Sequence, residues 1–109
     1  MKLEHENGVK SSEATEADVR AVFADDAGRG SFVILAESDQ VYMQAAGEGG
    51  GPFTLEYREG DESRHYHCLH TVARSVAEAA FLKYLQRDAT WKTDFRWRHL
   101  EEKPWWKIW

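Results

Sequence analysis

Residues 31–69 constrain the fold most, because short segments rich in β-forming residues alternate there with turn residues. Polar turn chemistry occupies residues 38–40 and 59–63, and a glycine-rich stretch covers residues 47–51. Such a spacing is typical of consecutive antiparallel strands joined by hairpins. The expected strands are 31–36, 41–46, 53–58 and 65–69.

Apolar patterning predicts which side of these strands is buried. Phe53, Leu55 and Tyr57 alternate with polar residues, so we expect them to face inward. Cys68 falls on the apolar side of its segment by the same rule. Segment 31–36 is continuously apolar, which predicts a strand covered on both faces.

Two helices are expected on either side of this strand region. Thr15 and Asp18 form a Thr-x-x-Asp pattern that can cap a helix N-terminus, and Gly28 suits its end. Residues 75–78 (Ser-Val-Ala-Glu) match a capping box, and the apolar helical run that follows should end near Asp88.

Alternation resumes at residues 95–98, which predicts a final strand. The order of elements indicates an α+β fold, with an antiparallel sheet of about five strands and two helices packed on one face. We expect one domain over residues 1–109. Polar residues 1–12 are predicted to be a flexible lead-in, and residues 103–109 form a tryptophan-rich tail.

The charge and apolar content narrow the function. A net charge of −5 disfavours binding to nucleic acid, because phosphate neutralisation needs a basic surface. The longest apolar run, 32–36, is far too short to cross a membrane. No apolar signal segment follows Met1, and Cys68 is the single cysteine, so a cytoplasmic location is expected.

Residues that could carry chemistry have simpler structural interpretations. His65 and His67 would share one strand face, where Glu56 could complete a metal site, but Cys68 would point to the other side. The glycine stretch 47–51 leads into another predicted strand and no helix, which disfavours a phosphate loop. We therefore expect no enzyme, no metal and no cofactor.

The five tryptophans all lie in residues 91–109, where five lysines and arginines outnumber three acids. Trp91 and Trp97 are expected to pack between helix and sheet. Trp105, Trp106 and Trp109 have three alternative readings: they cover the core, they form an interface, or they do not belong to the natural sequence.

The middle of the chain resembles a known family. The stretches that carry the resemblance are Phe32-Val33-Ile34-Leu35, Val41-Tyr42-Met43-Gln44, Phe53-Thr54-Leu55-Glu56-Tyr57-Arg58-Glu59 and the run from Phe81 through Trp91 to Trp97. This pattern is similar to the immunity proteins of bacterial polymorphic toxin systems, especially the small α+β type paired with deaminase toxins. The resemblance implies a cytosolic inhibitor that binds a cognate toxin domain, without cofactor or reaction.

An acidic strand face and its loops would suit a basic partner, such as a toxin that handles nucleic acid. The predicted partner-binding residues are Glu48, Glu56, Arg58, Glu59, Asp61, Glu62, Trp105 and Trp106. Two other functions remain open: a self-associating structural or adaptor module, for example a homodimer, and a metal-binding or enzymatic domain that uses His65 and His67.

Overall fold

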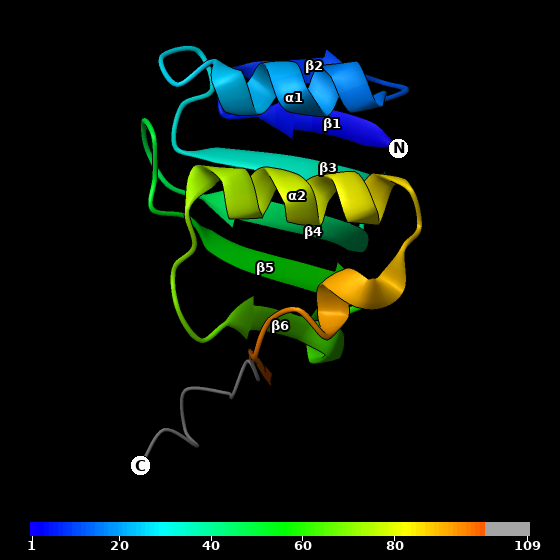
Figure 1. The fold of residues 1–109 in the computed structure, drawn as a ribbon. Helices are drawn as coiled ribbons and strands as arrows, with labels where there is room; N and C mark the ends of the chain where they lie inside the picture. Colours follow the sequence, from blue (N-terminus) through cyan, green and yellow to red (C-terminus); the bar gives the residue numbers. More distant parts are fainter. Residues whose placement is uncertain (100–109) are drawn as a thin grey trace, which may run out of the picture.

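The computed structural model describes residues 1–99, which form one antiparallel sheet of seven strands with helices in front of it (Figure 1). The strand order across the sheet is β2-β1-β3-β4-β5-β6-β7. The strands are β1 (Lys2–His5), β2 (Gly8–Ser11), β3 (Phe32–Ser38), β4 (Val41–Ala46), β5 (Thr54–Glu59), β6 (His65–Cys68) and β7 (Trp97–His99).

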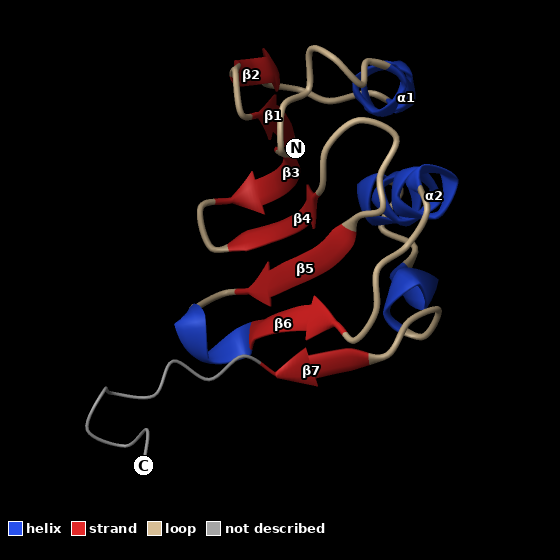
Figure 2. Cartoon of the chain, turned by 90° about the vertical axis from the view of Figure 1, so that its left-hand side faces the viewer, coloured by secondary structure: helices blue, strands red, loops and turns tan. Residues whose placement is uncertain are grey.

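Both α-helices lie on the same face of the sheet, and the other face carries no α-helix among the described residues (Figure 2). The helices are α1 (Glu16–Ala24) and α2 (Arg74–Leu85), with short 3-10 turns η1 (Glu62–Arg64) and η2 (Ala89–Lys92). The α+β class with an antiparallel sheet is confirmed, but the expected strand number of about five is wrong. Within the described part of the chain, no helix is long and apolar enough to span a membrane.

The two extra strands come from residues 1–12, which were expected to be a flexible lead-in. Leu3 is fully buried and pairs with Leu35 of β3, so this polar segment contributes one essential core side chain. Glu6 and Asn7 form the hairpin turn, and Gly8, which begins β2 opposite His5, has a positive φ of 128°. The prediction failed because the remaining side chains of the hairpin are mostly polar and exposed.

The central strands have the expected order and facing. Phe53, Leu55 and Tyr57 are all buried against the helices, as the alternation predicted. The prediction that segment 31–36 is covered on both faces is wrong. Phe32 and Ile34 are only half-buried, because β3 has helices on one side and an open face on the other.

Helix α1 begins as its sequence predicts. The Thr15 hydroxyl accepts a bond from the Asp18 amide (3.2 Å), and the Asp18 carboxylate accepts one from the Thr15 amide (2.9 Å). These bonds from Thr15 hold the pKa of the Asp18 carboxyl below its usual range. The reciprocal pair satisfies two amides that a helix start otherwise leaves without partners.

The capping box predicted for α2 is wrong. Ala73 occupies the cap position and makes no side-chain bond, so Ser75 already lies inside the helix. The helix also ends at Leu85, before the predicted end near Asp88. Asp88 instead caps η2, where its carboxylate accepts a bond from the Thr90 amide (3.0 Å). The final strand likewise begins two residues later than expected, at Trp97.

Alanine substitution should affect the free energy of unfolding differently at Thr15, which caps α1, and at Ser75, which lies inside α2. Thr15→Ala is expected to lower the free energy of unfolding by about 1 kcal/mol, because both capping bonds depend on Thr15 geometry. Ser75→Ala should be neutral or raise that free energy by a few tenths of a kcal/mol, since alanine is the better helix former. Urea unfolding at neutral pH measures both.

The pH dependence of the Thr15→Ala effect provides the control. A lowered pKa in the folded state contributes stability above the unfolded pKa of Asp18, and this contribution is lost as the pH falls through the folded pKa. The difference between Thr15→Ala and the wild type should therefore shrink in acid. Equal losses for Thr15→Ala and Ser75→Ala would contradict the assignment of the caps.

Candidate protein-binding surface

The helix-free side of the sheet, here called the open face, presents two rows of side chains that follow the strand register. The first row runs across six strands as Glu4, Ile34, Gln44, Glu56, His67 and Arg98. The second row contains Lys2, Ala36, Tyr42, Arg58 and His65. A hollow of about 490 Å³ lies over β1, β3 and β4, with Ile34, Ala36 and Tyr42 in its lining. The open face is therefore broad, mixed in polarity and partly concave.

A chain of polar contacts orders the open face at β5 and β6. Arg58 Nε donates to His65 Nδ1 (3.0 Å), and Arg58 Nη1 donates to the Gln40 side-chain oxygen (2.8 Å). The Glu56 carboxylate lies 3.5 Å from His65 Nε2. Arg58 also lies over the ring of Tyr42, with its Cζ 5.7 Å from the centroid. These contacts fix the side chains in one arrangement before any partner binds.

This geometry predicts the tautomer of His65. Because Nδ1 accepts a bond from Arg58, the proton of the neutral imidazole must sit on Nε2, facing Glu56. Imidazole ¹⁵N chemical shifts of the wild type should show the Nε2–H form. Arg58→Met removes the donor and should shift the population toward a mixture of the two tautomers. An unchanged ¹⁵N pattern in Arg58→Met would show that another contact sets the tautomer.

The same contacts are relevant to the alternative in which His65 and His67 bind a metal ion. His65 and His67 share the open face as predicted, but both ring nitrogens of His65 already face protein groups. His67 Nδ1 is buried without a hydrogen-bond partner in the described part of the chain. Residues 1–99 contain no group of three or more histidine, cysteine or acidic side chains placed to hold a metal ion. Cys68 is buried on the helix side, as the alternation predicted.

The structure separates the acids that were predicted to form one binding region. Glu48 is exposed in the β4–β5 loop, at the end of β5 opposite to Asp61 and Glu62. Glu59 lies on the helix side, where it forms an ion pair with Lys92 of η2. The expectation of one acidic sheet face is therefore wrong, because strand alternation sends neighbouring acids to opposite sides.

The other predicted partner-binding residues lie in different parts of the structure. Glu56 and Arg58 do lie together on the open face, in adjacent rows. The Asp61 carboxylate is already hydrogen-bonded within its own turn, because it accepts bonds from the Ser63 amide and hydroxyl at the start of η1. Trp105 and Trp106 lie outside the described residues.

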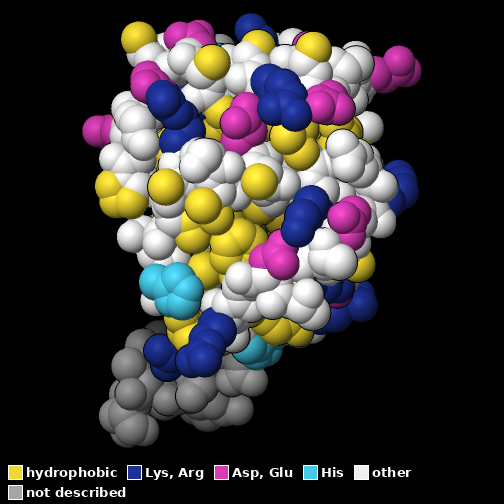
Figure 3. All heavy atoms as spheres, viewed as in Figure 1, with side chains coloured by type: hydrophobic (Ala, Val, Ile, Leu, Met, Phe, Trp, Pro, Cys, Tyr) yellow, Lys and Arg dark blue, Asp and Glu magenta, His cyan; other side chains and the backbone are white. Residues whose placement is uncertain are grey.

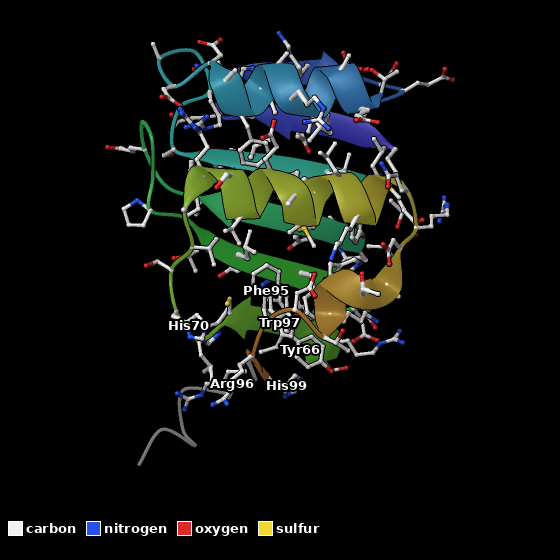
Figure 4. The ribbon with its side chains drawn as sticks, in the orientation of Figure 1. Tyr66, His70, Phe95, Arg96, Trp97 and His99 are labelled. Carbon is white, nitrogen blue, oxygen red and sulfur yellow. The ribbon has the colours of Figure 1, made fainter. Side chains whose placement is uncertain are left out.

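An aromatic cluster covers the helix side of β5, β6 and β7, where no α-helix lies. Tyr57 stacks on Tyr66 with centroids 4.8 Å apart and meets the edges of Trp91 (4.8 Å) and Trp97 (4.7 Å). Figure 4 shows Tyr66, Phe95 and Trp97 together below α2, and apolar side chains reach the surface in this area (Figure 3). Trp91 is buried between Tyr84 of α2 and Tyr57 of β5, as predicted, whereas Trp97 is half-buried against Tyr57, Trp91 and Phe95.

Burial in this cluster raises the pKa of the Tyr57 hydroxyl to about 12. Tyr84 packs on Trp91 (5.5 Å), and burial raises its pKa as well. Both phenols therefore stay neutral at physiological pH and act as packing groups.

Sequence reasoning missed Arg29, whose side chain is fully buried. Its Nη1 donates to the carbonyls of Val22 (3.2 Å) and Phe23 (3.1 Å) at the end of α1, and its Nη2 donates to the Gly49 carbonyl in the β4–β5 loop. The guanidinium also lies 4.9 Å from the centroid of the Phe53 ring. Arg29 thus ties the glycine-rich β4–β5 loop to the end of α1, and a lone arginine between glycines gives no sequence signal of this role.

These features define a class of molecule: an α+β protein with an antiparallel sheet that is covered by helices on one face and open on the other. Comparison of the chain with protein-family models, curated proteins and solved structures gives no match. The resemblance to immunity proteins therefore rests on the sequence pattern alone.

Proposed function

We propose that this chain is an inhibitor protein of the immunity class, which neutralises a cognate bacterial toxin domain by direct protein–protein binding. The single observation that supports this most is the open face, a surface spanning several strands that no described helix covers. The pattern resemblance to immunity proteins of polymorphic toxin systems supplies the partner class.

The open face has the properties that a binding surface needs. Its polar side chains at β5 and β6 hold one another in place, so little conformational entropy is lost when a partner docks. Its central strands also carry apolar and aromatic side chains, Ile34 and Tyr42, beside the 490 Å³ hollow. Aromatic and apolar groups at the centre of a patch contribute most to protein–protein affinity.

Co-expression with the protein encoded beside this chain's gene tests the proposal. We expect the full chain to restore the growth of cells that produce the toxin domain, and to co-purify with that domain. A neighbour that forms no complex and is not neutralised would overturn the proposed function.

A matched pair of glutamine substitutions locates the interface. Gln44 lies in the middle of the open face, and Gln86 lies at the end of α2 on the helix side. Gln44→Arg should weaken the complex by at least about ten-fold, because a long charged side chain would enter the centre of the interface. Gln86→Arg makes the same chemical change elsewhere and should leave affinity unchanged. The opposite ranking would place the interface on the helix side.

A further inference from the structure

Positive charge without a carboxylate partner is concentrated at one end of the open face. Most lysines and arginines of residues 1–99 have a carboxylate oxygen within 4.0 Å. Among the described residues, the lysines and arginines without such a carboxylate are Lys10, Arg58, Arg96 and Arg98. Three of these four belong to β5, to β7 or to the residue before β7.

Strand alternation brings two of these groups, Arg58 and Arg98, to the open face. Trp97 packs on the helix side against Tyr57, so its strand neighbour Arg98 projects to the other side, and Arg96 directly precedes β7. Arg98 pairs in register with His67, and the Arg96 carbonyl accepts a bond from the Leu69 amide (3.0 Å). Figure 4 shows Phe95 and Trp97 directed toward α2 and Arg96 directed away from it.

The β5–β7 cationic surface therefore consists of Arg58, His65, His67, Leu69, Arg96 and Arg98. Leu69 adds an apolar contact, since 53% of its surface is exposed. Strands β6 and β7 contain no acidic residue, and Glu56 of β5 is the one acid of these three strands on the open face, against Arg58 and Arg98. Among the described residues, the open-face side chains of β5–β7 are thus locally cationic although the whole chain carries a net charge of −5.

We propose that the β5–β7 cationic surface docks an acidic segment of the partner protein. The inference rests on the proposed function and reverses the polarity that the sequence suggested, since the partner contributes carboxylates at this position. Arg96 and Arg98 are exposed, and exposed guanidinium groups can form charge-assisted hydrogen bonds with carboxylates at little desolvation cost. Leu69 would contact an apolar residue within the same acidic segment.

The observations favour an acidic protein segment over single-stranded nucleic acid. Nucleic acid binds such surfaces by stacking bases on exposed aromatic rings. The aromatic residues of β6 and β7, Tyr66 and Trp97, are instead packed in the cluster on the opposite face. The net negative charge of the chain also repels a long polyanion more than a short acidic segment.

Titration of the ¹⁵N-labelled full chain with an octaglutamate peptide tests the inference at about 20 mM ionic strength, where charge interactions are weakly screened. We expect amide shifts confined to β6, β7 and the neighbouring part of β5, and their loss at high salt. Arg98→Glu should weaken this binding by about five-fold or more. Lys10→Glu makes the same charge change at the other edge of the sheet and should leave binding unchanged.

Three results would overturn the inference. The first is that octaglutamate causes no amide shifts, and the second is that Arg98→Glu and Lys10→Glu weaken its binding equally. The third is that an octathymidylate strand binds more tightly to the same amides, which would assign the surface to nucleic acid. The toxin complex separates this inference from the proposed function. A complex that forms and is unaffected by Arg98→Glu would leave the inhibitor function standing and remove the acidic docking site.

Discussion

Replacing Arg29 by alanine is expected to lower the free energy of unfolding by about 3–5 kcal/mol, the range typical for removal of one member of a buried charged network. Arg29 is fully buried and connects the end of α1 to the β4–β5 loop. Its loss would leave the carbonyls of Val22, Phe23 and Gly49 without this donor, in a site that has little access to water. Urea unfolding followed by far-UV circular dichroism measures the change.

Arg29 also contributes to a second connection across the fold. Asp26 lies 3.4 Å from Arg29 and 2.5 Å from Arg74 of α2. The Arg74 side chain is the main cause that holds the pKa of the Asp26 carboxyl below its usual range, and Arg29 adds to it. Removal of Arg29 therefore weakens a network that joins α1, α2 and the glycine loop, so the effect should exceed that of one hydrogen bond.

Two further variants make the Arg29 result specific. Arg29→Lys keeps the charge but cannot reproduce the forked donor geometry, so most of the loss should persist. Arg20→Ala removes an exposed arginine whose Glu16 partner lies one turn away, and its effect on stability should be far smaller. A loss for Arg29→Ala no larger than that for Arg20→Ala would contradict the structural role assigned to Arg29.

The strand meander could be predicted because its signals are local. Phe53, Leu55 and Tyr57 alternate with polar residues, and each turn in this region has recognisable chemistry. The first hairpin was missed although Asn7-Gly8 is a hairpin signal. Its pattern is weak because Leu3 alone supplies the buried apolar group of β1.

Interactions between distant segments could not be predicted from local pattern. Nothing in the sequence pairs Arg29 with the carbonyl of Gly49, twenty residues away. The same limit applied to the candidate site. A count of acids suggested an acidic face, but the structure places Glu59 beside Lys92 on the helix side. It also leaves Arg96 and Arg98 without a carboxylate partner among residues 1–99. Charge on a surface depends on which side chains share a face and which are already paired.

The aromatic cluster leads to the second large prediction, Trp91→Ala, for which we expect a loss of about 3–5 kcal/mol in the free energy of unfolding. The Trp91 ring meets Tyr57, Tyr84 and Trp97 at centroid distances of 4.8, 5.5 and 5.9 Å. Trp91 is 5% exposed, and it lies where the two α-helices leave this end of the sheet uncovered. Its removal would open a cavity beside β5 that the short turn η2 has no side chain to refill.

Leu69→Ala is the matched control, because it also truncates a large apolar residue near β6 but one that is 53% exposed. Its effect on unfolding should stay within about 0.5 kcal/mol. Trp91→Phe should recover part of the loss, since a smaller ring can still meet the edge of Tyr57. Proton chemical shifts of Tyr57, which the neighbouring rings displace, should move toward ordinary values in Trp91→Ala. If Trp91→Ala unfolds at the same urea concentration as Leu69→Ala, then the cluster does not take the place of a helix over β5–β7, and the cover of this end of the sheet must come from elsewhere in the chain.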